Sequence, residues 1–238
     1  MAIKGYERKI PVIYGIDYLT HDIPHYLLSV SENYQTCHSF FASLRLLNYP
    51  LQAVVADDNL NIFQSCLSLY PRAVTQLCQN HYKQNLRLGL SVGSDPTHRP
   101  FMEEVERLFE KKRSRDEFVR LAGKIYTRFS WDPLYQGVMA DLQRRLSELL
   151  AYNQMSGVPV TTNLIESYNS HLEGRLKTIK GFESFAHADA WLNAYFIRRR
   201  LKKFTDCRGK FRGLNGKCSL ELTLKPYCKI DVVSKLIR

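Results

Sequence analysis

The chain has 238 residues, of which 45% are hydrophobic and 12% aromatic, so it can fold around a sizeable core. No apolar run approaches the roughly 20 residues that cross a bilayer, and the opening MAIKGYERKIPVIYGID lacks the apolar stretch and cleavage site of a signal peptide. The 34 Lys and Arg residues outnumber the 23 Asp and Glu residues, and this net charge of +11 favours a polyanionic partner, above all nucleic acid.

The first part of the chain begins with a predicted hairpin and a helix. Residues 10–16 and 24–30 are short runs rich in β-branched and aromatic side chains, separated by a polar turn. This pattern predicts two antiparallel strands. Apolar residues at helical spacing then predict a helix from Ser31 or Asn33 to about Asn48.

An apolar run ending in two carboxylates follows. The segment LQAVVADDN, residues 51–59, ends in Asp57 and Asp58 and is typical of a buried strand with acidic residues at its C-terminal end. A helix, a strand and a second helix are predicted next, over about 59–69, 73–78 and 80–90. The alternation predicts an α/β fold, with a mixed sheet covered by helices.

The alternation stops at SVGSDPTHRP, residues 91–100, where a glycine and two prolines interrupt it. Three helical patterns follow without a strand, over about 101–112, 115–129 and 134–152. After a second breaker, NQMSGVPVTT, two more helices are predicted over about 163–180 and 184–203.

These breaks divide the chain into four segments. We expect the N-terminal part of the α/β core at 1–90, an all-α insertion at 91–156, C-terminal helices of the core at 157–204 and a basic tail at 205–238. Residues 198–217, RRRLKKFTDCRGKFRGLNGK, hold nine basic residues and one acidic residue. This run is either a phosphate-binding surface or a solvated helix end and tail.

Cysteine usage gives no disulfide framework. Six cysteines occur without any C-x-x-C pair in a chain too long to need disulfides, so we expect reduced thiols. In CQNH, Cys78 and His81 form a C-x-x-H pair, which can begin a zinc site. A second pair of ligands is not evident, and a buried thiol beside a hydrogen-bonded histidine is the alternative. Nucleophilic catalysis by Cys78 lacks a third, orienting residue and is set aside.

Two interpretations compete for Glu166 in TTNLIESYNSHLE, residues 161–173. Asn163 is a favoured N-cap, and Glu166 three residues later can complete a capping box. Alternatively, Glu166 and Asp57 are the distant carboxylates of a two-metal phosphoryl-transfer site, because Mg²⁺ prefers hard oxygen ligands. Only one of Asp57 and Asp58 can face such a site, since successive strand residues point to opposite faces; helix capping is the alternative for this pair.

Three blocks of the sequence carry a resemblance to a known family. VVADDN, YPRAVTQLCQNHYKQNL and TTNLIESYNSHLEGRLKTIKGFESF resemble, in order and spacing, blocks of Mutator-like and bacterial insertion-sequence DDE transposases. The resemblance covers about residues 10–200. Its most specific part is the late block, in which two threonines, Asn163, Glu166 and Asn169 precede a basic stretch and GF. It implies an RNase H-like (retroviral integrase-like) core with an all-α insertion before the catalytic glutamate.

The resemblance also implies roles for individual residues. Asp57 corresponds to the family's second catalytic aspartate, Glu166 to its glutamate, and Cys78 with His81 to its C-x-x-H pair. Asp57 and Glu166 would hold two Mg²⁺ (or Mn²⁺) ions. DNA, as transposon ends and target, is the implied partner, bound by a homo-oligomer in the bacterial cytoplasm, at the nucleoid. The basic residues expected to contact phosphates are Arg175, Lys177, Lys180, Arg198, Arg199, Arg200, Lys202 and Lys203.

One departure from the family pattern concerns the first catalytic aspartate. In the family it lies on a strand before the segment that IKGYERK resembles, and this chain begins at Met1, after that point. We therefore expect an N-terminally truncated transposase with weak or no activity, unless Asp17 substitutes for the first ligand. The alternatives are a DNA-binding transposase remnant without catalysis and an unrelated RNase H-like nuclease.

Overall fold

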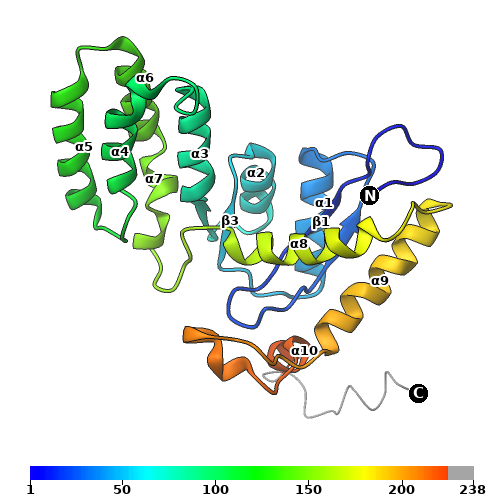
Figure 1. Cartoon of the computed structure of the whole chain (residues 1–238). Helices are drawn as coiled ribbons and strands as arrows, with labels where there is room; N and C mark the ends of the chain where they lie inside the picture. The colour runs from blue at the N-terminus through cyan, green and yellow to red at the C-terminus, as the bar shows by residue number, and fades with distance from the viewer. Residues whose placement is uncertain (225–238) are drawn as a thin grey trace. The chain divides into compact units, whose positions relative to one another are not determined.

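The computed structural model describes residues 1–224, which form two compact units (Figure 1). Unit 1 consists of Met1–Pro50 together with the chain from Asn163 onward, and unit 2 consists of Leu51–Thr162. Each unit has a hydrophobic core of its own. Helices and strands occur in both units, which confirms the predicted α/β character.

The predicted hairpin and first helix are confirmed in unit 1. Strands β1 (Val12–Tyr14) and β2 (Tyr26–Leu28) pair antiparallel, and α1 (Tyr34–Leu46) follows them. Asn33 caps α1: its Oδ1 accepts a hydrogen bond from Thr36 N at 3.0 Å, while its N–H donates to Thr36 Oγ1 at 2.9 Å. This reciprocal pair of bonds satisfies two donors at the start of α1.

The remaining helices of unit 1 come from the C-terminal part of the chain. They are α8 (Asn163–Lys177), α9 (Phe185–Leu201), the short 3₁₀ segment η3 (Gly209–Leu214) and α10 (Ser219–Leu224). In α9, Ala188, Leu192 and Phe196 recur every four residues and are buried. They share a cluster with Ile23 and Leu28, so α9 packs on the hairpin through one helical face.

The first residues of the chain also belong to unit 1. Ile3 is 3% exposed and forms a β-bridge with Phe182. Lys4 N donates to the Phe182 carbonyl at 2.9 Å, and Phe182 N donates to the Ala2 carbonyl at 3.1 Å. Gly181, with φ of 142°, makes the turn that brings Phe182 into this position, a conformation in which residues with a Cβ are strained.

A buried ion pair fastens α9 to the chain just before β2. Asp22 is fully buried, and Arg200 donates from Nε and Nη2 to its two carboxylate oxygens at 2.8 Å each. Ser219, at the start of α10, donates a third hydrogen bond to Asp22 at 3.1 Å. Asp22 therefore connects three segments that are far apart in the sequence.

The strands of unit 2 follow the predicted order. Strands β3 (Ala53–Ala56) and β4 (Val74–Leu77) pair in parallel, with α2 (Leu60–Leu69) between them in sequence and α3 (Gln79–Gly89) after them. The prediction of a single mixed sheet is wrong for the described residues. Their strands form two separate two-stranded sheets, because the hairpin β1–β2 belongs to unit 1 and the parallel pair β3–β4 belongs to unit 2.

Unit 2 continues with the predicted strand-free helices. They are α4 (Arg99–Arg107), α5 (Arg115–Phe129), α6 (Pro133–Arg144) and α7 (Leu146–Leu149), with the 3₁₀ turns η1 (Pro96–His98) and η2 (Ala151–Asn153). The helix predicted over 134–152 is broken at Arg145, the residue between α6 and α7. Leu146 and Leu149, after the break, are buried against the core.

Helices and strands of unit 2 share one core. Phe101, Phe118 and Leu142, from three different helices, belong to the same buried cluster as Leu77 of β4.

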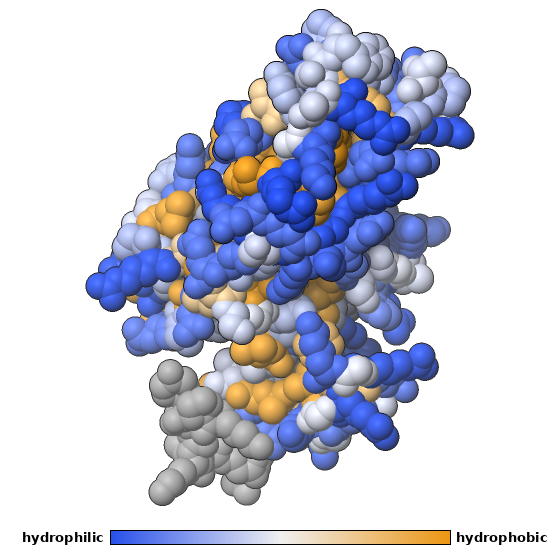
Figure 2. All heavy atoms as spheres, turned by 90° about the vertical axis from the view of Figure 1, so that its left-hand side faces the viewer, coloured by the Kyte–Doolittle hydropathy of each residue, from blue (hydrophilic) through white to orange (hydrophobic). Residues whose placement is uncertain are grey.

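Figure 2 shows that hydrophilic side chains cover most of the visible face, with apolar residues exposed between them. Within residues 1–224, no helix combines the length and apolar character of a membrane span.

A buried glutamine joins β4 to the end of the helical segment. Gln76 is fully buried in β4, and its Nε2 donates to the Leu77 carbonyl at 2.8 Å and to the Leu149 carbonyl at 2.9 Å. Its Oε1 accepts from Tyr152 N at 2.9 Å. Gln79 Nε2 donates a second bond to the Leu149 carbonyl, also at 2.9 Å.

Replacing Gln76 with methionine is expected to lower the free energy of unfolding by about 2–4 kcal/mol, because buried backbone groups lose partners that water cannot replace. Equilibrium denaturant unfolding, followed by circular dichroism, measures the change. Gln143→Met, on the exposed surface of α6, is the matched control and should change stability little. Equal losses in the two variants would show that the Gln76 amide contributes nothing specific.

Candidate active site

The two aspartates after β3 point to different partners within unit 2. Asp57 Oδ1 lies 2.7 Å from His81 Nδ1, and the Asp57 side chain is 57% exposed. Asp58 Oδ1 instead accepts from Arg145 Nη1 at 2.6 Å. Only Asp57 therefore faces the C-x-x-H pair, as strand alternation predicts. The capping alternative for both aspartates is wrong, because Asn59 caps α2, its Oδ1 accepting from Asn61 N at 3.0 Å.

Cys78 and His81 are brought together by the start of α3. Cys78 is the N-cap residue of α3, and His81 lies three residues later, one turn along the same helix. His81 Nδ1 is 3.3 Å from Cys78 Sγ. The thiol is fully buried, whereas 29% of the His81 side chain is exposed.

Thr162 completes this cluster from the far end of unit 2. Its N–H and Oγ1 donate to Cys78 Sγ at 3.4 and 3.2 Å. The same hydroxyl oxygen also lies 3.5 Å from Asp57 Oδ1 and 3.2 Å from His81 Nδ1. The sequence identified Thr162 only as part of the TTN block, and no spacing rule in the sequence predicts a contact 84 residues from Cys78.

The geometry does not support a nucleophilic cysteine. In a relay, the nucleophile and the orienting carboxylate contact opposite nitrogens of the imidazole. Here Asp57 Oδ1 and Cys78 Sγ both contact Nδ1 of His81. The arrangement is instead an exposed carboxylate with an imidazole and a hydroxyl beside it, and carboxylates that bind metals are themselves hydrogen-bonded by neighbouring groups.

Metal-binding atoms are concentrated in this cluster. One ligand atom each from Asp57, Cys78 and His81 lies within 4.8 Å of the others. The Asp57 carboxylate suits Mg²⁺, which takes oxygen ligands, and its exposed position at the end of β3 is compatible with an ion. The thiol and imidazole are ligands that softer ions prefer.

Glu166 lies in unit 1, in the first turn of α8, and is exposed. α8 begins at Asn163 itself, one residue earlier than an N-cap role for Asn163 predicts. A carboxylate in the first turn is favoured by the partial positive charge of the helix N-terminus. Asp57 belongs to unit 2, so sharing of metal ions by Asp57 and Glu166 remains a prediction.

Asp17, the considered substitute ligand, is engaged in a turn of unit 1. Its Oδ1 accepts from Leu19 N at 2.8 Å and from Thr20 N at 2.7 Å, and its Oδ2 accepts from the Tyr49 hydroxyl. These bonds organise residues 17–20 in the manner of an Asx turn. The carboxylate of Asp17 therefore has a structural role in this turn that requires no metal ion.

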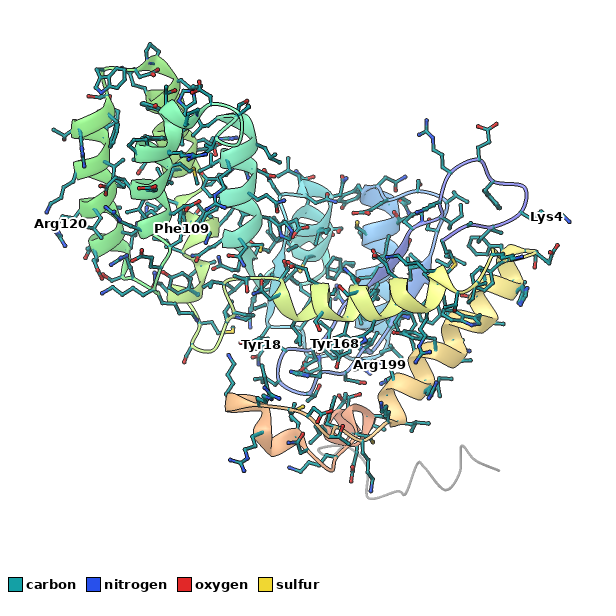
Figure 3. The ribbon with its side chains drawn as sticks, in the orientation of Figure 1. Lys4, Tyr18, Phe109, Arg120, Tyr168 and Arg199 are labelled. Atoms are coloured by element: carbon teal, nitrogen blue, oxygen red, sulfur yellow. The ribbon has the colours of Figure 1, made fainter. Side chains whose placement is uncertain are left out.

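The basic residues predicted to bind DNA fall into two groups. Six of them are exposed: Arg175, Lys177, Lys180, Arg198, Lys202 and Lys203. The guanidinium carbon of Arg199 lies 4.3 Å from the centroid of the Tyr168 ring. Both residues are labelled in Figure 3. Burial raises the pKa of Tyr168. Arg200 is held by Asp22, so its guanidinium has a structural partner instead of the predicted phosphate.

The described part of the basic tail ends at Leu224 in α10. Lys210 Nζ lies 4.5 Å above the Tyr18 ring, so one tail cation packs on unit 1 itself. The predicted tail continues through 225–238, including Cys228, and that part lies outside the described residues.

Comparison with protein-family models gives one finding. The model described as "Transposase, Mutator family" matches residues 21–194, well over half of the chain. The matched span contains Asp57, Cys78, His81 and Glu166. No curated protein matches the chain.

Proposed function

The chain belongs to the Mutator family of transposases, and from this premise we propose that it is a DDE-type enzyme whose metal-dependent cleavage of DNA uses Asp57 and Glu166. The observation that carries the proposal is the orientation of Asp57. Its carboxylate stands exposed at the end of β3, with Oδ1 2.7 Å from His81 Nδ1 and 3.5 Å from the Thr162 hydroxyl. A structural salt bridge does not require this convergence of three elements on one carboxylate.

Within this proposal, Asp57 and Glu166 hold Mg²⁺ (or Mn²⁺) in an RNase H-like core. When bound, the ions stabilise charge on the attacking and leaving oxygens of the phosphodiester. His81 Nδ1 lies 2.7 Å from Asp57 Oδ1 and orients the carboxylate that would hold an ion. The reactions expected are hydrolytic cleavage at the transposon end and transfer of the 3′ end to target DNA.

Binding of the DNA backbone is assigned to the exposed cations of unit 1. Lys177 and Lys180 follow Glu166 along and just after α8, and Arg198 and Lys202 lie at the end of α9. Exposed Lys and Arg residues contact phosphates without reading sequence. Arg200 is left out of this set because Asp22 holds it.

Cleavage of DNA that carries the ends of the encoding element tests the proposal. The transposase hypothesis expects nicks at the element ends that depend on Mg²⁺ or Mn²⁺. Salt-sensitive binding without nicks would favour a DNA-binding protein that lacks catalysis, a second candidate suggested by the engagement of Asp17 in its own turn. Cleavage of any DNA, regardless of sequence, would favour an unrelated nuclease.

A double substitution, Lys177→Gln with Lys180→Gln, is expected to weaken DNA binding at low salt and to reduce the slope of log affinity against log salt by about 2. Each lost phosphate contact releases roughly one counterion fewer. Fluorescence anisotropy over a series of salt concentrations measures the slope. Lys111→Gln with Lys124→Gln, exposed in the helical part of unit 2, removes the same charge elsewhere. An equal change of the salt slope in both double variants would contradict the assignment of DNA contacts to Lys177 and Lys180.

A further inference from the structure

We propose that Asp57, Cys78 and His81 bind Zn²⁺, or a divalent ion of similar softness, at one site within unit 2. The three side chains supply an oxygen, a sulfur and a nitrogen that lie within 4.8 Å of one another. They come from the end of β3 and the first turn of α3, two neighbouring elements of one compact unit. The site does not depend on Glu166 or on the proposed DNA cleavage.

The chemistry of the donors selects the class of ion. Thiolate, imidazole and carboxylate are the ligands that Zn²⁺ accepts, and three of them with one open position form a common zinc arrangement. Mg²⁺ prefers oxygen ligands in an octahedron and has little affinity for sulfur. His81 presents Nδ1 to the other two groups, and this nitrogen binds metals as the neutral imidazole.

One ligand–ligand distance is already close to that of a tetrahedral site, and a second requires a small movement of Asp57. Zinc bonds of about 2.3 Å to sulfur and about 2.0 Å to nitrogen or oxygen place the ligand atoms roughly 3.3–3.6 Å apart. Cys78 Sγ and His81 Nδ1 are 3.3 Å apart. Asp57 Oδ1 and His81 Nδ1, at 2.7 Å, are joined by a hydrogen bond and must separate by about 0.6 Å to admit an ion. The exposed Asp57 side chain has room for this movement.

Thr162 forms hydrogen bonds with the sulfur ligand. Its N–H and hydroxyl both donate to Cys78 Sγ, at 3.4 and 3.2 Å. Donors of this kind orient metal-bound ligands and are themselves part of the metal's affinity. Thr162 is buried, whereas 57% of the Asp57 side chain and 29% of the His81 side chain are exposed. An ion can therefore approach from the side of Asp57 and His81.

Occupation by Zn²⁺ has a consequence that rests on the proposed function. If Asp57 also holds Mg²⁺ during DNA cleavage, Zn²⁺ removes it from that chemistry and acts as an inhibitor. The binding site is measured without any activity, so failure of the cleavage proposal leaves the zinc proposal intact. If Zn²⁺ binding is confirmed but DNA cleavage is insensitive to Zn²⁺, Asp57 is not a ligand of the ions that cleave DNA.

The test is titration of the reduced full chain with Co²⁺, the spectroscopic substitute for Zn²⁺. We expect saturable binding with the visible bands of tetrahedral Co²⁺ and a thiolate-to-cobalt charge-transfer band in the near ultraviolet. Zn²⁺ should abolish both signals, and a large excess of Mg²⁺ should not. Absence of the charge-transfer band from the folded protein would overturn the proposal.

Variants assign the ligands. Cys78→Ser should remove the charge-transfer band, and Asp57→Asn should weaken Co²⁺ binding by more than about 100-fold, above the range for outer-shell partners. Thr162→Val, which keeps the backbone donor, should weaken it by about 10-fold. Cys66→Ser, another buried thiol of unit 2, and Asp58→Asn are the matched controls and should retain full binding.

Circular dichroism checks that each variant is folded. If Cys78→Ser does not fold, Asp57→Asn decides the question, because the mostly exposed Asp57 side chain is dispensable for packing. Undiminished Co²⁺ binding in folded Asp57→Asn would overturn the site. A charge-transfer band that survives Cys78→Ser would do the same, because another cysteine would then be the ligand.

Discussion

Replacing Asp57 with asparagine is expected to lower the rate of Mg²⁺-dependent DNA cleavage by roughly 1000-fold, since several kcal/mol of charge stabilisation are lost with the metal ligand. The amide keeps the size of the side chain and can still bond His81, so the fold should be unchanged. The rate of nicking at the element ends, at saturating DNA, measures the loss.

The neighbouring residue provides the control for this experiment. Asp58→Asn changes the same chemical group one position later, but Asp58 is bonded to Arg145 and points away from His81. It should keep cleavage within a few fold of the unmodified chain. Glu166→Gln should match the loss in Asp57→Asn, because both carboxylates are assigned to the same ions. Full activity in either Asp57→Asn or Glu166→Gln would exclude the proposed pair.

Replacing Asp22 with alanine is expected to destabilise unit 1 by about 3 kcal/mol, because Arg200 and Ser219 lose a fully buried acceptor. The Arg200 side chain is 25% exposed, so some of its charge regains water and the loss stays near the lower end of the range for broken buried pairs. Denaturant unfolding of the full chain measures it. Asp206→Ala, on the exposed tail, is the matched control and should have little effect.

A second variant separates the ion pair from simple packing. In Asp22→Leu with Arg200→Met, both charges are removed and apolar atoms fill the space. If the unpaired guanidinium causes the loss, the double variant should recover a large part of the free energy of unfolding that Asp22→Ala loses. A double variant as unstable as Asp22→Ala would show that the hydrogen bonds from Ser219 and the shape of the site matter more than charge.

The local arrangement of the candidate site follows from sequence patterns. An apolar run ending in Asp57 predicts a carboxylate at a strand end, and a three-residue spacing on a helix predicts that Cys78 and His81 share one turn. The structure has both features. Strand alternation also predicts that Asp57 and Asp58 have different partners.

The contacts between distant segments could not be read from the sequence. Thr162 and Cys78 meet because residues 160 and 79 are joined by a backbone hydrogen bond of 2.9 Å, and nothing in their composition signals this. Arg200 looked like its basic neighbours, yet a buried carboxylate 178 residues away holds it. Long-range pairing of this kind depends on which segments pack together, which periodicity does not encode.

The end of α7 at Leu149 has a similar cause. Helical periodicity continues through residues 134–152, so one helix was predicted. The Leu149 carbonyl, which would continue a helix, accepts instead from Gln76 and Gln79. Tertiary partners for the backbone have replaced the last helical turns.

The place of Thr162 in the chain gives the thiol an influence beyond its own pocket. Thr162 is the final residue of unit 2, and the following peptide bond opens α8, which carries Glu166 on its first turn. The backbone passes between the units only here and after Pro50. Cys78 Sγ thus accepts hydrogen bonds from the residue at one of the two points where the chain passes between units, four residues before Glu166. Loss of the Cys78 sulfur would therefore remove a hydrogen-bond acceptor from Thr162, the last residue of unit 2 before this crossing.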